Sequence, residues 1–209
     1  MTAPRLVVVS AGLSTPSSTR LLADRLTEAT RSALAAGPAE PAVDVIELRS
    51  LAQDIAARLV SAFPSPALAE ALDSVARADA LIAVTPVFSA SYSGLFKSFF
   101  DVLEPDTLAG VPVLLAATGG TARHSMVLDH ALRPLFTFLR AEPVPTAVFA
   151  ASEDWGGTGD ALTDTLPARI GRAGAELAGR LEHRRPAPPA AGLTGIVAFA
   201  EQLAAVQRH

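Results

Sequence analysis

Short apolar runs alternate along the chain with longer segments in which apolar residues recur every three or four positions. The short runs are almost continuously apolar and rich in β-branched residues, which is typical of strands buried on both faces. They predict four strands and a shorter fifth one, at Arg5–Ser10, Val43–Leu48, Ala80–Thr85, Val113–Thr118 and Thr146–Ala150. Strands of this kind, separated by helices, favour a parallel sheet covered on both sides.

The segments between the strands carry the helical period. Leu22, Leu26 and Ala29 would share one face of a helix that begins near Ser17 or Ser18. Further helices are predicted over Ala67–Ala78, Gly94–Leu103, Ser125–Arg140 and Ala161–His183. This alternation predicts a doubly wound five-stranded α/β fold, and we favour the flavodoxin-like strand order 2-1-3-4-5 over a Rossmann order.

A proline-rich segment divides the chain near its end. Residues 1–183 contain every predicted strand, and a length of this size suits one domain with a substantial core. The run PAPPAAG, which begins at Pro186, predicts a linker to an apolar helix over Ile196–Val206. We therefore expect residues 184–209 to form a separate tail that docks on the domain or on another subunit.

Composition narrows the class of protein. The net charge of −4 argues against a nucleic-acid partner, because such proteins usually carry a basic excess. No apolar run approaches the roughly 18–20 residues of a membrane span, and the N-terminus lacks the pattern of a secretion signal. A cytoplasmic protein without a membrane partner is expected. The absence of cysteine excludes disulfides and thiolate metal ligands.

The loop after the first strand, SAGLSTPSSTR, is unusually rich in hydroxyl groups. It contains neither G-x-G-x-x-G nor G-K-[ST], so neither common nucleotide fingerprint applies. It does place three hydroxyl residues at a helix N-terminus, where unpaired N–H groups and the helix dipole favour an anion. A single hydroxyl suffices to cap a helix, so the cluster favours a cradle for a terminal phosphate over a simple polar turn. The candidate ligands are Ser10, Ser17, Ser18, Thr19 and Arg20.

Two further loops are expected at the same edge of the sheet. The residue before a proline avoids the helical region, so Thr85-Pro86 is predicted to end the third strand. A flat heteroaromatic ring would fit over Pro86, Val87 and Phe88, although ordinary packing explains these residues equally well. After the fourth strand, Gly119-Gly120 permits close approach of the backbone to a ligand. Arg123 follows on the same rim and is a candidate for a second phosphate.

Four segments in this order resemble the NADPH-dependent FMN reductases of the flavodoxin-like superfamily, especially those that partner luciferase-like monooxygenases. They are VVVSAGLSxPSSTR, TPVFxAxYSGLFKxFxD, ATGGTxRH and LDHALRP. The resemblance implies that the hydroxyl-rich loop holds the FMN phosphate. It also implies that the isoalloxazine ring is bracketed by Pro86, Val87, Phe88, Thr118, Gly119 and Gly120. Beside these, Thr85 and Arg123 remain candidate cofactor-binding residues from the two loops themselves.

The activity implied by this resemblance is hydride transfer from NADPH, or NADH, to FMN. The cofactors supply the chemistry, so no catalytic side chain and no metal site is expected. Reduced FMN would pass to a flavin-dependent monooxygenase, and a homodimer or homotetramer is expected from the family. Two alternatives stay open: an NAD(P)H:quinone or azo reductase that retains FMN, and a flavodoxin-like electron carrier without enzymatic activity.

Pro134 lies within a strongly helical pattern, where proline removes a hydrogen bond and costs about 3 kcal/mol or more unless the backbone adapts. A π-type bulge just before it would be one adaptation. His130 is interpreted as a partly buried histidine beside this kink, with an influence on flavin release or subunit packing as the alternative. Trp155 follows the fifth strand, where packing is favoured over contact with a flavin edge.

Overall fold

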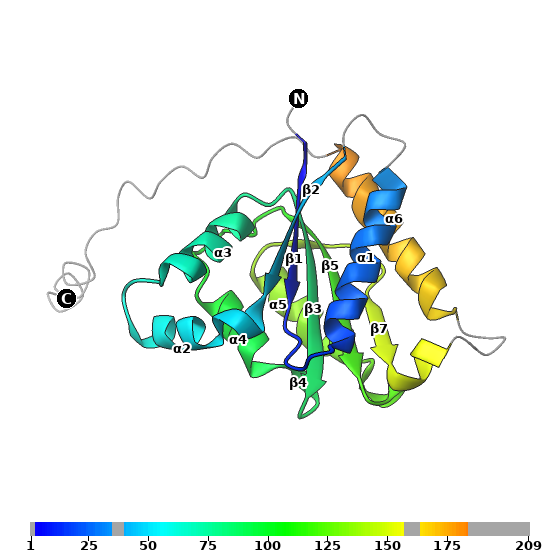
Figure 1. Cartoon of the computed structure of the whole chain (residues 1–209). Helices are drawn as coiled ribbons and strands as arrows, with labels where there is room; N and C mark the ends of the chain where they lie inside the picture. The colour runs from blue at the N-terminus through cyan, green and yellow to red at the C-terminus, as the bar shows by residue number, and fades with distance from the viewer. Residues whose placement is uncertain (1–2, 35–39, 157–163, 184–209) are drawn as a thin grey trace, which may run out of the picture.

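A single sheet runs through the centre of the molecule and has helices on both faces (Figure 1). The computed structural model describes residues 3–34, 40–156 and 164–183. The strands are β1 Arg5–Ser10, β2 Ala42–Glu47, β3 Ala80–Phe88, β4 Ser91–Tyr92, β5 Pro112–Gly119, β6 Glu142–Pro143 and β7 Val148–Ala151. The order is β2-β1-β3-β5, with β6 and β7 both paired to β5, and every pair except β3–β4 is parallel.

The outermost position of the sheet is shared by two short strands. β6 pairs with the start of β5, where Pro112 lies opposite Glu142, and β7 pairs with its end, where Gly119 lies opposite Ala151. The predicted fifth strand, Thr146–Ala150, corresponds to β7, whereas β6 was not predicted. Counted by position, the order corresponds to the flavodoxin-like 2-1-3-4-5 arrangement predicted from the sequence.

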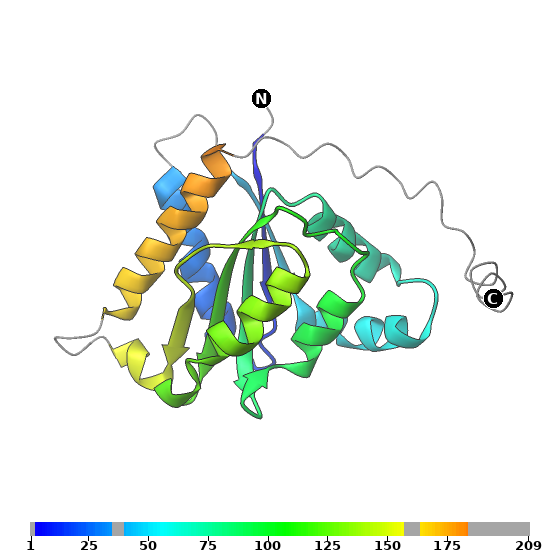
Figure 2. The ribbon, with the colours of Figure 1, turned by 180° about the vertical axis from the view of Figure 1, so that it is seen from behind.

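Helices cover the two faces unequally, as Figures 1 and 2 show from opposite sides. One face carries α1 Ser18–Leu34 and α6 Leu166–His183, whose side chains pack with Leu6 and Val8 of β1. The opposite face is covered by α2 Ala52–Val60, α3 Pro66–Ala76, α4 Gly94–Asp101 and α5 Arg133–Phe138. Alternate residues of the same strand, Val7 and Val9, point to this second face.

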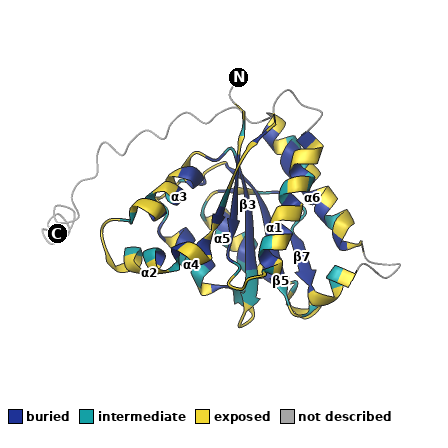
Figure 3. Cartoon of the chain, in the orientation of Figure 1, coloured by how far each residue is buried: buried dark blue, intermediate teal, exposed yellow. Residues whose placement is uncertain are grey.

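Burial follows the layers. The central strands are almost wholly buried, whereas the outer surfaces of the helices and the tip of the β3–β4 hairpin are exposed (Figure 3). Gly174 of α6 contributes to the close contact of the two helices on one face, because a Cβ there would lie 2.9 Å from the Ala29 backbone of α1. A small residue at this crossing allows α1 and α6 to approach each other.

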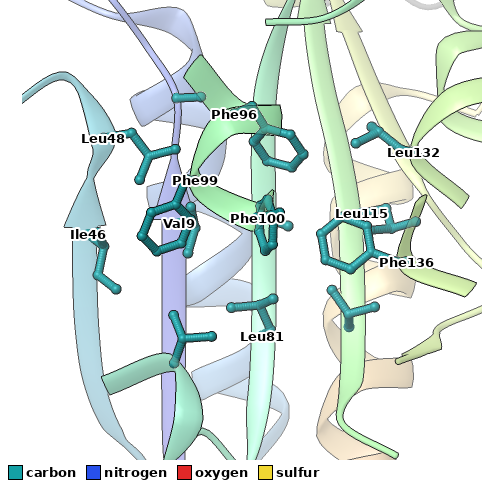
Figure 4. Close-up of a cluster of buried hydrophobic side chains, with 14 of the residues drawn as sticks. Val9, Ile46, Leu48, Leu81, Phe96, Phe99, Phe100, Leu115, Leu132 and Phe136 are labelled. Atoms are coloured by element: carbon teal, nitrogen blue, oxygen red, sulfur yellow. The ribbon is translucent and has the colours of Figure 1, made fainter. Parts of the chain in front are cut away.

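The larger core contains a cluster of aromatic rings between the sheet and its helices (Figure 4). The ring centroids of Phe96 and Phe100 are 4.7 Å apart, and those of Phe100 and Phe136 are 4.9 Å apart in an edge-to-face arrangement. All three side chains are at most 2% exposed. Such pairs add to the hydrophobic stabilisation because the positive edge of one ring meets the negative face of another.

The third strand is longer than predicted. The expectation that Thr85-Pro86 ends it is wrong, since β3 continues through Pro86 to Phe88. Proline holds its predecessor in an extended conformation, which also suits a strand. Beyond it the chain turns through Ser89 and Ala90, both with positive φ (49° and 68°), and returns as β4. A two-residue turn with positive φ at both positions matches the twist of a β-hairpin.

A π-helix occupies Leu128–Leu132, directly before Pro134 in α5. The adaptation considered for this proline is therefore present, and the predicted helix Ser125–Arg140 is divided into a π segment and a short α-helix. His130 is exposed, so its interpretation as a partly buried histidine is wrong.

Residues 49–60, for which the sequence pattern predicts no element, contain most of the 3-10 helix Leu48–Leu51 and the whole of α2. The predicted tail at 184–209, with its helix Ile196–Val206, lies outside the described residues, as do positions 161–163 of the last predicted helix. Among the described residues, no helix has the length and apolar character needed to cross a bilayer.

The aromatic cluster yields a stability prediction. Phe136→Ala should lower the free energy of unfolding by about 3–5 kcal/mol, because it leaves a cavity among buried rings. Phe63, which lies between α2 and α3 and is 85% exposed, provides the matched control. Phe63→Ala should change the free energy by about 0.5 kcal/mol or less. Urea unfolding followed by circular dichroism measures both, and equal losses would contradict the described packing.

Candidate functional site

The carboxyl ends of β1, β3, β5 and β7 meet at one edge of the sheet, and a cavity of about 450 Å³ lies there. This is the position at which open α/β sheets bind ligands. The volume is within the range of small-molecule sites, about 300–1,000 Å³. The cavity is lined by Leu13, Ser14, Ser17, Ser18, Thr19, Pro86, Val87, Phe88, Thr118, Gly119, Gly120, Ser152 and Trp155.

Nine of the thirteen residues predicted from the sequence line this one cavity. They come from three separate segments, namely the start of α1, the end of β3, and the end of β5 with Gly120. These segments are brought together because β1, β3 and β5 are parallel neighbours in the sheet. The lining is completed from positions outside the predicted set by Leu13, Ser14, Ser152 and Trp155. Their common signal is position, since each follows a strand end at the same edge of the sheet.

The start of α1 forms one end of the cavity. Ser17 caps the helix, because its Oγ accepts a hydrogen bond from the backbone N–H of Arg20 at 3.2 Å. The first N–H groups of a helix have no partner within the helix. Those of Ser18 and Thr19 therefore remain available to an anion at this end of the cavity. Gly12 lies behind the cap, where an added Cβ would collide with Ser17 Oγ.

A buried hydrogen bond joins the first loop to the end of β5. The hydroxyl groups of Thr19 and Thr118 are 2.8 Å apart, and the two residues are 2% and 4% exposed. Both residues also line the cavity. The bond fixes the start of α1 relative to the glycine pair that follows Thr118.

The other end of the cavity is a largely apolar shelf. Pro86 and Val87 are half-buried, whereas Phe88 is 47% exposed at the end of β3. Thr85 secures the base of this hairpin, because its Oγ1 accepts a hydrogen bond from Ser93 N–H at 3.0 Å and donates one to Pro86 O at 2.9 Å. The exposed aromatic ring of Phe88, at the edge of this apolar shelf of Pro86 and Val87, is suited to stacking against a flat ligand.

The glycine pair gives the cavity a flat wall. A Cβ at Gly119 would lie 2.8 Å from Cζ of Phe149, so a larger residue there would force the Phe149 ring to move. Gly120 has open space on its side. Gly119 is thus required by the packing of Phe149, whereas at Gly120 a ligand can approach the backbone closely.

Trp155 closes the cavity from the turn after β7. The turn is held by Asp154, which accepts hydrogen bonds from the backbone of Ala151 and from Arg169, each at 2.8 Å. The guanidinium carbon of Arg25 lies 4.9 Å from the centre of the Trp155 ring. The tryptophan thus packs against α1, as predicted, and also faces the cavity.

Four predicted site residues lie outside the lining. Ser10 is buried at the end of β1, and Thr85 holds the hairpin. Arg123 is exposed in the 3-10 helix Ala122–His124, beyond the glycine pair. Arg20 is paired with two carboxylates instead of facing the cavity.

The lining carries no ionisable side chain. The positive character of the site comes from the N-terminus of α1, which has no acidic residue in its first turn. Nearby, a hydrogen bond to Asp24 and the attraction of Asp24 and Glu47 raise the pKa of Arg20 above its usual value, so the guanidinium is always charged. Within the described ranges, no group of acidic and histidine side chains has an arrangement able to hold a metal ion.

Comparison with known proteins agrees with this geometry. The family model for NADPH-dependent FMN reductases matches residues 4–156. The chain belongs to this family. An FMN reductase (NADPH) of Pseudomonas aeruginosa is 40% identical over 182 residues, which are 87% of this chain and 94% of the relative.

Two solved structures are similar over most of the chain. An oxidoreductase from Corynebacterium diphtheriae is 45% identical with a TM-score of 0.83, over 88% of this chain and all of the other. The apo form of the NADH:FMN oxidoreductase EmoB is 28% identical with a TM-score of 0.72, over 89% and 92% of the two chains. The chain is thus an oxidoreductase of a family that uses FMN with NADPH or NADH, which excludes the electron-carrier alternative.

The residues of the cavity fit FMN. A dianionic phosphate matches the hydroxyl groups and free N–H groups at the start of α1. A flat ring system matches the shelf at Pro86–Phe88 and the pair Gly119-Gly120, which presents backbone without side chains to the cavity. Both features belong to the same cavity, so one flavin mononucleotide can use them together.

Trp155 is the only tryptophan in the chain, and it provides a direct test of this placement. Saturating FMN should quench the intrinsic tryptophan fluorescence of the protein, because the indole lines the cavity. Trp155→Phe should abolish the signal while quenching of flavin fluorescence still reports binding. If FMN binds while the tryptophan emission stays unchanged, the flavin lies elsewhere.

Proposed function

We propose that this protein reduces FMN as a substrate, with NADPH or NADH as hydride donor, and releases reduced FMN to a flavin-dependent monooxygenase. The observation that supports this proposal most strongly is a cavity without charged side chains, in which a hydroxyl-rich helix N-terminus and an apolar shelf lie together. Family membership supports the reductase activity. Delivery to a monooxygenase rests on the resemblance of the four sequence segments, and we assign the reaction to the cytoplasm.

The three loops have separate roles in this proposal. Ser17, Ser18 and Thr19 bind the phosphate through hydroxyl and backbone N–H groups. The isoalloxazine ring lies between the shelf of Pro86, Val87 and Phe88 and the wall of Thr118, Gly119 and Gly120. Ser10 and Thr85 support these loops from behind, where they are buried.

When bound, the cofactor pair supplies the chemistry, a hydride moving from nicotinamide C4 to flavin N5. The protein's part is to orient two flat rings and to exclude water between them. Phe88 and Leu13, which are 47% and 46% exposed at the cavity, offer apolar contacts to the outer ring. No side chain of the lining is placed to transfer a proton.

Arg123 is our candidate for a phosphate of the pyridine nucleotide. It follows the glycine wall by three residues and is exposed on the same rim. A guanidinium group recognises phosphate through paired hydrogen bonds. We also propose a homodimer or homotetramer, supported by exposed apolar side chains on the segment around the π-helix, namely Met126 and Phe138.

The purified protein should be colourless and should oxidise NADPH only when FMN is added, because FMN is a substrate in this proposal. The visible spectrum and the rate of NADPH consumption, with and without FMN, test both points. A yellow protein that requires a quinone or an azo dye for turnover would support the FMN-retaining alternative. No oxidation under any of these conditions would contradict the proposed function.

The rate should be independent of pH between about 7 and 8.5, since no ionisable side chain lines the cavity and phosphate monoesters lose their second proton near pH 6. The quantity to measure is kcat/KM for NADPH at saturating FMN. The control is thermal stability over the same pH range. A bell-shaped profile inside this interval, without loss of the fold, would reveal an acid or base that the proposal lacks.

A further inference from the structure

The guanidinium of Arg20 is held by two carboxylates. Its Nε lies 2.8 Å from Oδ1 of Asp24, one turn further along α1, and its Nη1 contacts Oε1 of Glu47. The Arg20 side chain is 34% exposed and each carboxylate 51%. These pairs are therefore accessible to solvent and to a ligand at the start of α1.

The fold places Glu47 at this position. β1 and β2 are parallel and in register, with Ser10 opposite Glu47 at the last pair of the ladder. Glu47 therefore lies at the carboxyl edge of the sheet, beside the loop that follows β1. The neighbouring Arg49 contacts Thr15 of that loop, so the end of β2 packs against the loop.

The two carboxylates engage the cationic side chain that follows the hydroxyl residues. Arg20 comes directly after Ser17, Ser18 and Thr19, where its positive charge would be available to the phosphate end of the cavity. Its Nε and Nη1 are instead directed to Asp24 and Glu47. The phosphate then relies on the helix N-terminus and neutral hydroxyl groups, while Arg20 is engaged elsewhere.

We propose that Asp24 and Glu47 are specificity-determining residues that compete with the FMN phosphate for Arg20, and so keep FMN binding weak enough for release after each turnover. This inference rests on the proposed function, because it assumes that the phosphate lies at the start of α1. It gives a physical reason why FMN would leave the protein after each turnover, as a substrate does. The two carboxylates act through Arg20 and do not touch the reacting atoms.

The test compares FMN with riboflavin, which has the same ring system but no phosphate. Asp24→Asn and Glu47→Gln should each tighten FMN binding by about twofold to fivefold at low ionic strength, the range expected for exposed ion pairs. Riboflavin binding should stay unchanged, and the difference should shrink as salt is added. Dissociation constants come from quenching of flavin fluorescence on titration with protein.

Asp73→Asn is the matched control. Asp73 also pairs with an arginine four residues away on a helix, in this case Arg77 of the α3 C-terminus, and is similarly exposed at 57%. It does not line the cavity. This variant should bind FMN and riboflavin as the unmodified protein does.

A double-mutant cycle tests whether the carboxylates act through Arg20. In an Arg20→Gln background, Glu47→Gln should no longer tighten FMN binding preferentially, because the competing cation is gone. If the preference for FMN persists in that background, the carboxylate repels the phosphate directly and the proposal is overturned. The proposal also fails if Glu47→Gln leaves FMN affinity unchanged, or strengthens riboflavin binding equally.

The behaviour of the unmodified protein distinguishes a failure of the proposed function from a failure of this inference alone. If it neither binds FMN nor turns it over, the proposed function is overturned and this inference with it. If it reduces FMN normally while the carboxylate variants bind FMN with unchanged affinity, only the inference is overturned. Retention of flavin through gel filtration by Asp24→Asn/Glu47→Gln, but not by the unmodified protein, would support the inference.

Discussion

The site depends on the parallel, in-register pairing of β1, β3 and β5. Ser10 pairs with Val84, and Thr85 and Pro86 pair with Ala117 and Thr118, which fixes the ends of the three strands relative to one another. A slip by one residue would turn every side chain of the moved strand to the opposite face. The two buried clusters resist such a slip, because each takes alternate residues of the same strands. Packing far from the cavity therefore sets the relative positions of the three loops that line it.

The cavity offers a ligand hydrogen-bonding groups and shape, and no charged side chain. Its lining consists of hydroxyl, apolar and glycine residues and includes no arginine, while Arg20 is paired with two carboxylates and Arg25 is stacked on Trp155. Backbone N–H groups at a helix start can hold an anion without a cationic side chain. Such a site recognises a phosphate by position and shape, yet gains less from long-range attraction than a lysine- or arginine-lined one. That balance suits a ligand that must leave after each turnover.

The strand order and nine lining residues could be predicted because the apolar runs and the loop composition are local signals. Glu47 could not be linked to Arg20 in this way, since their contact depends on the register of β1 and β2 across 27 residues of chain. The continuation of β3 beyond Pro86 was missed because the proline rule describes one residue, whereas the strand is completed by its pairing with β4. The helix α2 was overlooked because it is short, with Ile55 as its one buried residue.

Stability and binding are supported by different parts of the molecule. The aromatic cluster of Phe96, Phe100 and Phe136 lies on one face of the sheet, and none of its members lines the cavity. The cavity in turn is made by loops whose backbone conformation is fixed by a few contacts, such as the hydrogen bond between Thr19 and Thr118. Loss of a core ring lowers stability without changing which groups face the ligand, as long as the sheet keeps its register. Loss of a loop contact changes the ligand's surroundings at little cost to the core. Substitutions in the two regions should therefore affect binding and unfolding independently, since residues without shared partners contribute almost additively.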